Sequence, residues 1–202
     1  MADGFVHLYQ TEWSVVRAAL RISSLAVAGV MLANPNTKKI HSLEWDDQRD
    51  TLVPIDEDVL MRWLALADRD EVSFNFWFDA NTDLCYRVRR VTSEVVVEEF
   101  SLDGFGGPRY ELGQDKVIRL VIDEMHRTGP AVVGLVADRW GTSLEMDIDD
   151  AVITGMTPVT IYPELLILRP EVADRHPELR DWGPRPYGEF TAFDPTRILD
   201  RW

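Results

Sequence analysis

The chain has 202 residues and a mass of 23.1 kDa, with 46% hydrophobic and 28% charged residues. This length allows one domain that buries enough apolar surface to fold without a disulfide or a structural metal. The 35 acidic and 21 basic residues give a formal charge of −14 at pH 7. Because binding to nucleic acids and anionic membranes depends on Lys and Arg, this charge argues against both as partners.

Two features bear on the cell compartment. The most apolar run, residues 25–33, is far shorter than the roughly 20 residues of a transmembrane helix, and the first residues do not resemble a signal peptide. Cys85 is the only cysteine, so no intramolecular disulfide can form, which is typical of a reducing compartment. We therefore expect a cytoplasmic protein without a membrane segment.

The first predicted element is a helix over residues 11–22. Thr11 is suited to the N-cap position, and Trp13, Val16 and Leu20 recur at helical spacing. The apolar run over residues 25–33 contains β-branched residues and a glycine, which favours a buried strand, with a continuous helix as the alternative. A turn would then lead into a partner strand over residues 39–45.

A second helix is predicted over residues 57–67, after a polar loop over residues 46–54. Asp56 is suited to cap this helix, and Asp58 lies in its first turn, where a carboxylate offsets the helix dipole. Its apolar stripe is expected to belong to the core and consists of Val59, Leu60, Trp63, Leu64 and Ala67.

The clearest pattern covers residues 71–102. The first strand alternates, with Phe74, Phe76 and Phe78 on one face and polar residues on the other. A loop over residues 79–83 and a turn at Thr92-Ser93 then connect two further strands. This pattern predicts a three-stranded antiparallel meander with one buried face.

After a glycine-containing loop, a helix is predicted over residues 114–127, ended by Gly129-Pro130. Its inner face is expected to comprise Val117, Leu120, Val121 and Met125. A hairpin over about 131–148 follows, and residues 165–168 suit a further strand.

The tail over about 170–202 is rich in proline and should be extended, wrapping the domain through its aromatic residues. The order of elements predicts a single α+β domain over residues 1–202. We expect a mainly antiparallel sheet, built from the meander and the hairpin, packed against two or three helices.

No motif in the chain fixes a reaction. The run over residues 104–108 lacks the spacing of a dinucleotide-binding or phosphate-binding loop, so a turn is the preferred interpretation. Glu145, Asp147 and Asp149 would share a strand face, but the glycine and distal glutamate of a calcium loop are missing. Arg87 and Arg89 would share another strand face and pair with acids across the next hairpin. We expect no catalytic residues, no cofactor and no metal.

The acidic residues are concentrated in one part of the chain. Twelve acids and three arginines between Glu44 and Asp83 contribute −9 of the total charge, whereas the first 43 residues sum to +2. Because concentrated like charge costs stability, this band is a candidate partner-binding surface. The residues expected to carry recognition are Glu44, Asp46, Asp47 and Asp50 in the loop, and Asp56, Glu57 and Asp58 at the start of the helix.

These properties favour an acidic protein-binding module, in concrete form an immunity-type inhibitor of a basic toxin or of another cationic partner. One alternative is an enzyme or small-molecule-binding protein with a site assembled from scattered residues, for which His126, Asp138 and Trp140 are the first candidates. Another is a structural or regulatory subunit. The sequence favours a protein that is not an enzyme, but it does not decide between the two. It gives no information on the oligomeric state.

Overall fold

The computed structural model describes residues 4–46, 49–103, 110–143 and 146–201. Its strands are β1 (Phe5–Gln10), β2 (Ile40–Asp46), β3 (Arg49–Ile55), β4 (Glu71–Trp77), β5 (Asp83–Arg90), β6 (Val96–Ser101), β7 (Val132–Asp138), β8 (Leu165–Leu168), β9 (Arg185–Tyr187) and β10 (Phe190–Phe193). The helices are α1 (Val15–Val27), α2 (Glu57–Leu64), α3 (Tyr110–Thr128), α4 (Ile148–Ile153) and α5 (Pro170–Ala173), with short 3-10 helices η1 (Gly129–Ala131), η2 (Pro177–Trp182) and η3 (Ile198–Arg201).

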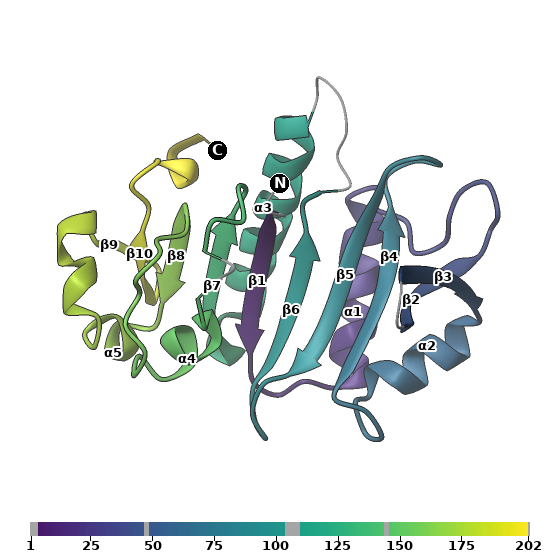
Figure 1. Ribbon diagram of the computed structural model, residues 1–202, viewed down its shortest axis with the longest axis horizontal. Helices are drawn as coiled ribbons and strands as arrows, with labels where there is room; N and C mark the ends of the chain where they lie inside the picture. Colours follow the sequence, from purple (N-terminus) through teal and green to yellow (C-terminus); the bar gives the residue numbers. More distant parts are fainter. Residues whose placement is uncertain (1–3, 47–48, 104–109, 144–145, 202) are drawn as a thin grey trace.

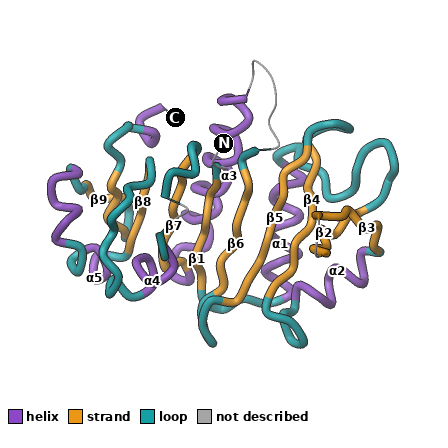
Figure 2. The backbone as a smooth tube through the Cα atoms, in the orientation of Figure 1, coloured by secondary structure: helices purple, strands orange, loops and turns teal. Residues whose placement is uncertain are grey.

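The strands form one continuous antiparallel sheet in the order β3-β2-β4-β5-β6-β1-β7-β8-β10-β9 (Figure 1). The three longest helices, α1, α2 and α3, lie on one face, and α4 and α5 lie near the other face of the β7–β10 half (Figure 2). The predicted α+β class with a mainly antiparallel sheet is confirmed. Among the helices of the described segments, none is long and apolar enough to cross a membrane.

The predicted meander over residues 71–102 is confirmed as β4, β5 and β6. Phe74 lies opposite Tyr86, and Tyr86 lies opposite Phe100, so three aromatic rings meet on the helix-covered face. Phe74 and Phe76 are fully buried there, whereas Phe78 beyond the strand end is half-buried. Ring contacts of this kind contribute stability beyond the apolar area that they bury.

The N-terminal helix begins and ends later than the sequence predicts. Ser14, and not Thr11, is the N-cap, and its hydroxyl accepts a hydrogen bond from the Arg17 amide. The helix continues to Val27 and ends before Gly29, whose φ of 81° suits glycine. The predicted strand over residues 25–33 is therefore wrong, and its helical alternative is correct as far as Val27.

The helix α1 buries a charged side chain. Its buried face consists of Ala18, Arg21 and Leu25, while Val16 and Leu20 point outward. The core-facing positions include an arginine that is neutralised by buried acids.

The polar loop predicted over residues 46–54 is also wrong. Residues 49–55 form β3, which pairs with β2 from Ile40↔Ile55 to Asp46↔Arg49. The partner strand predicted over residues 39–45 is confirmed as β2. Polar composition hid β3 because it is an edge strand of the sheet, where polar residues and Pro54 are tolerated.

The predicted hairpin over about 131–148 does not form. Its first strand is confirmed as β7, but β7 pairs with β1 and β8. Beyond it the Asp138 carboxylate accepts hydrogen bonds from the amides of Trp140 and Ser143, which turns the chain. Asp147 then caps α4, a helix where a strand was predicted. Glu145 and the run over residues 104–108 lie outside the described residues.

The C-terminal tail is more structured than predicted. The strand over residues 165–168 is confirmed as β8, and α5 and η2 follow it. The hairpin β9–β10 then extends the sheet beyond β8, which buries Phe190 and Phe193. The expected wrapping of the tail is thus achieved by strand pairing as well as by aromatic packing.

Candidate functional site

The acidic residues singled out by the sequence lie along the β3 end of the sheet and the start of α2 (Figure 1). Glu44 is on β2 opposite Thr51, and Asp46 and Asp50 take backbone positions near the hairpin turn. Asp56 follows the other end of β3. Since β3 rises about 3.4 Å per residue, the band follows roughly 20 Å of the sheet edge. Asp47 lies outside the described residues, and the side chains of Asp46 and Asp50 are not described.

The N-terminus of α2 holds the three acids Asp56, Glu57 and Asp58, all exposed. Asp56 occupies the N-cap position that the sequence predicts, but its side chain makes no capping hydrogen bond. Its carboxylate therefore stays available to another molecule. Glu57 and Asp58 offset the positive end of the helix dipole from the first turn, which explains part of their presence.

Two arginines lie near these acids without forming a salt bridge with them: Arg62 Nε donates to the backbone carbonyl of Asp58 at 3.3 Å, and Arg69 lines a hollow together with Glu44. Glu44, Asp56, Glu57 and Asp58 form no salt bridge with any residue whose side chain is described. Arg69, the arginine after α2, instead stacks over the Trp63 ring at 4.1 Å. The four carboxylates are exposed and form no ion pair with the described side chains, so they can bind a cation of another molecule.

A shallow hollow adjoins this band. It has a volume of about 370 Å³ and is lined by Ser42, Glu44, Trp63, Arg69, Glu71 and Ser73, among others. It lies where β2 and β4 diverge, because the two strands share a single register pair, Ser42↔Phe74. The hollow combines two acids with the Arg69 guanidinium, which already covers one face of the Trp63 ring, so its own cation occupies part of the site.

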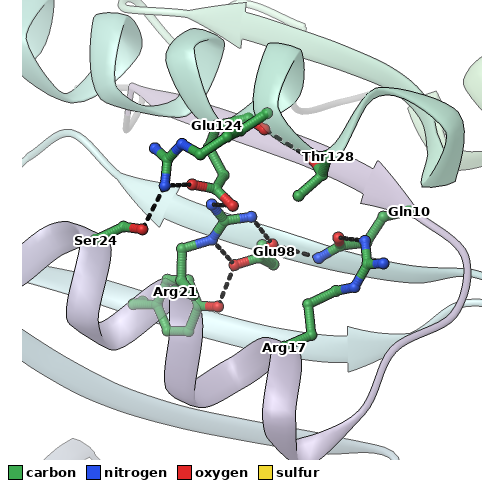
Figure 3. A network of polar contacts seen from close by, with 9 residues as sticks. Gln10, Arg17, Arg21, Ser24, Glu98, Glu124 and Thr128 are labelled. Atoms are coloured by element: carbon green, nitrogen blue, oxygen red, sulfur yellow. Dashed lines mark hydrogen bonds and ion pairs between the residues drawn. The ribbon is translucent and has the colours of Figure 1, made fainter.

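Several acids elsewhere in the fold pair with arginines, and the most deeply buried of these pairs lie between α1, α3 and β6 (Figure 3). Arg21 binds Glu98 on β6, with Nε 2.6 Å from Oε2, and its Nη1 lies 2.8 Å from Oε1 of Glu124 on α3. Gln10 and Tyr86 also donate to Glu98. Burial alone would lower the pKa of Arg21, but Glu98 raises it above its usual value. Arg21, Glu98 and Glu124 are all buried, and the exposed member of the network is Arg127, which pairs with Glu124 at 2.7 Å.

A second cluster lies on the opposite face of the sheet, beside α4. Arg89 on β5 binds Glu99 on β6 and reaches Asp149 on α4, with Nη1 2.7 Å from Oδ2. Arg87 also binds Glu99, so the predicted pairing of Arg87 and Arg89 across the hairpin is confirmed. Burial would raise the pKa of Asp149, but hydrogen bonds from Arg89 and Tyr9 hold it below its usual value.

The residues first considered for a scattered enzyme site do not converge. His126 lies beside Tyr187, with Nε2 2.9 Å from the hydroxyl oxygen. Asp138 uses both carboxylate oxygens to hold residues 140–143, and the Trp140 side chain is exposed. The sequence predicted the pairing of Arg87 and Arg89 across the hairpin. It offered no signal for the Arg21 cluster or for the contact of Arg89 with Asp149, because these partners lie far apart along the chain.

Comparisons with known proteins give a weak structural likeness. No family model and no curated protein matches the chain. Among solved structures, the chain is similar to the Pseudomonas aeruginosa T6SS protein PA0821, with 15% sequence identity and a TM-score of 0.46. The similarity covers 94% of this chain and 64% of that chain, so the chain spans less than two thirds of the other protein's length. A likeness of this degree does not indicate a function.

Proposed function

We propose that the protein binds a basic protein partner through the acidic β3–α2 end of its sheet, as an immunity-type inhibitor of a cationic toxin would. The observation that carries the proposal is the set of exposed carboxylates of Glu44 on β2 and of Asp56, Glu57 and Asp58 at the start of α2, which form no salt bridge with the described side chains. Like charges held together without counter-ions raise the free energy of the folded protein, and a basic surface docked against them relieves that repulsion.

The free edge of the sheet adds a second element of recognition. β3 is the outermost strand at this end, so alternate backbone groups face away from β2. Leu52 and Pro54 are alternate residues of β3, so their backbone groups point in the same direction. Pro54 has no amide hydrogen to donate, whereas Leu52 has both an amide and a carbonyl that could bond to an added strand. A partner segment beside β3 would combine backbone hydrogen bonds with charge pairing along the acidic row. The same charge disfavours a nucleic-acid partner.

The experiment begins with a pull-down from the native host with two baits. One is the wild type and the other is the neutralised variant Asp56→Asn, Glu57→Gln, Asp58→Asn. Asparagine keeps the N-cap preference of Asp56, and the changes leave the core untouched. We expect a basic protein to be retained by the wild type and depleted on the variant. Association rates are then measured against salt for both proteins with the purified partner.

The matched control neutralises three exposed acids at the other end of the sheet: Glu171→Gln, Asp174→Asn, Asp181→Asn. It removes the same total charge, and Glu171 also lies in the first turn of a helix. We expect the α2 variant to associate at least about tenfold more slowly at low salt, with a shallower salt dependence, and the control to stay within about twofold. Equal rates and equal salt slopes for the two variants would contradict the proposal.

A further inference from the structure

The outward face of α1 is apolar, although α1 is a surface helix. Of the eight large hydrophobic side chains found exposed among the described residues, four lie on α1. Val15 is 39% exposed, Val16 65%, Leu20 62% and Val27 91%. A helix packed on a sheet by one face normally places charged or polar side chains on the other.

The exposed residues form a narrow stripe. Val16, Leu20, Ser23 and Val27 are spaced four, three and four residues apart, which places them in line on a helix, opposite the buried Ala18 and Leu25. This is the spacing of the contact seam between two packed helices. Ala19 and Ala26 flank the stripe, and such small side chains allow a second helix to approach closely.

No charge interrupts the stripe. The two charged residues of α1 are Arg17 and Arg21, and both are directed away from it. Arg17 donates to Gln10 and lies 3.6 Å from Glu12, while Arg21 is buried against Glu98 (Figure 3). The chain has a net charge of −14, but its first 43 residues sum to +2. The uncharged face of α1 therefore lies in a part of the chain without the general excess of acid.

We propose that α1 is the contact surface of a homodimer, in which it packs antiparallel against α1 of a second copy. A twofold axis between residues 21 and 22 places Val16 opposite the partner's Val27, and Leu20 opposite the partner's Ser23. The stripe is thus self-complementary, as a twofold interface requires, with the largest side chain facing the smallest. A parallel arrangement would place the two leucines against each other and leave the two serines together.

The charges at the ends of α1 also match an antiparallel pair. Glu12, with a side chain that is 77% exposed, lies near the N-terminal end of the stripe. Arg127 on α3 donates to Ser24 near the other end and is itself more than half exposed. Within one copy Glu12 pairs with Arg17 at 3.6 Å and Arg127 with Glu124 at 2.7 Å, and in each pair the first-named residue is the exposed member. Antiparallel packing brings the exposed carboxylate of one copy toward the exposed guanidinium of the other. The α2 acids lie apart from this contact, since Trp13 before α1 binds the Leu64 carbonyl at the far end of α2.

The size of the stripe sets the expected affinity. Four partly exposed aliphatic side chains provide a patch on the order of a few hundred Å², similar to the largest apolar patch of a typical monomer. A standard interface buries about 800 Å² on each partner. We therefore expect a weak dimer with a Kd on the order of tens of micromolar. At protein concentrations below this Kd the monomer predominates.

The test is sedimentation equilibrium of the full chain from roughly 1 µM to roughly 500 µM, which brackets that Kd. We compare the wild type with Leu20→Glu and with the matched control Met156→Glu. Met156 is 76% exposed and lies outside α1, so both variants add one negative charge in place of an exposed apolar side chain. Glutamate is as good a helix former as leucine, and circular dichroism checks that Leu20→Glu is folded.

We expect Leu20→Glu to weaken the dimer by more than about tenfold and Met156→Glu to change it by less than about threefold. Added salt should strengthen the dimer, since it screens the repulsion between two acidic copies. A wild type that stays monomeric over the whole range at both low and high salt would overturn the proposal. Equal Kd values for the two variants would overturn it as well.

A cross-linking experiment tests the orientation. In a background with Cys85→Ser, Leu20→Cys and Ser23→Cys are prepared as separate proteins and oxidised alone or mixed. The antiparallel arrangement predicts that the mixture forms a disulfide-linked heterodimer faster than either protein forms a homodimer. Faster homodimer formation by Leu20→Cys would overturn the antiparallel register. The α2 neutralised variant should dimerise like the wild type, so failure here is distinct from failure of the proposed function.

Discussion

The wild type is expected to lose stability as the pH falls from 6.5 to 4.5, because His7 is buried in its neutral form. Replacing His7 by asparagine should abolish this part of the pH dependence. The His7 side chain lies on β1 beside the Phe5 ring, at a centroid distance of 4.3 Å, and the residue is 8% exposed. Burial lowers its pKa from 6.5 to about 4. Glu99 on β6 and Asp149 on α4 oppose this shift, while Arg87 and Arg89 on β5 add to it. The folded protein therefore holds a neutral imidazole.

The sign of the effect follows from the lowered pKa. Between pH 6.5 and pH 4 the unfolded chain binds a proton at His7 that the folded protein does not bind, so the free energy of unfolding falls as the pH falls. The difference between 6.5 and about 4 corresponds to about 3 kcal/mol. About 2 kcal/mol of this is lost by pH 5 relative to pH 7.5, and the remainder is lost as the pH approaches 4.

The assay is urea unfolding at pH 7.5, 6.5, 5.5 and 5.0 for the wild type and His7→Asn. We expect the wild type to lose about 2 kcal/mol more than the variant over this range, because asparagine does not titrate. His126→Asn removes an exposed histidine and leaves His7 in place, so it serves as the control. Parallel pH profiles for the wild type and His7→Asn would refute a buried neutral His7.

Two further predictions concern packing and buried charge. Arg21→Met should lower the free energy of unfolding by about 3–5 kcal/mol, since it leaves Glu98 buried without its cation, and the double variant Arg21→Met/Glu98→Gln should recover part of that loss. Gly134→Ala should cost about 1–3 kcal/mol, because a Cβ there would lie 2.7 Å from Val152 Cγ1 on α4 and 2.9 Å from the Ile167 carbonyl oxygen on β8. Urea unfolding measures both, and an unchanged midpoint in either case would contradict the stated cause.

The sequence predicts best where side chains alternate over a single buried face. β4 is recognisable because Phe74 and Phe76 alternate with Ser73 and Asn75, and the short connections to β5 and β6 define the meander. α2 is recognisable from its cap position and its stripe, of which Leu60 and Leu64 are buried. Local pattern and tertiary packing agree in these segments.

Prediction fails where tertiary packing overrides local preference. In residues 25–27 an alanine is flanked by a leucine and a valine, a pattern that also suits a strand. Strand propensity is a local property, so it does not reveal that Leu25 completes the buried face of α1. β3 was hidden because an edge strand tolerates polar residues and proline. The segment after Asp138 forms a turn through side-chain hydrogen bonds, which a hairpin pattern does not distinguish from a strand connection.

The long-range contacts of the arginine clusters could not be predicted from spacing. Arg21 and Glu98 are separated by 77 residues, and Arg89 and Asp149 by 60. In an ordinary amphipathic helix an arginine such as Arg21 faces the solvent, and apolar residues such as Val16 and Leu20 face the core. Burial of Arg21 therefore turns Val16 and Leu20 outward, which exposes the stripe proposed as a dimer contact.

The placement of arginines also explains where the excess acid lies. Arg21, Arg89 and Arg139 each bind two carboxylates in buried or half-buried positions. Cations held inside the fold in this way cannot neutralise carboxylates on the β3–α2 edge. The two proposed surfaces must then respond to salt in opposite directions. Screening weakens attraction between the acidic edge and a basic partner, and it weakens repulsion between two acidic copies that meet at α1. The association rate with a basic partner and the affinity of the dimer should therefore change with salt in opposite directions. That difference would show that two distinct surfaces are involved without altering either of them by mutation.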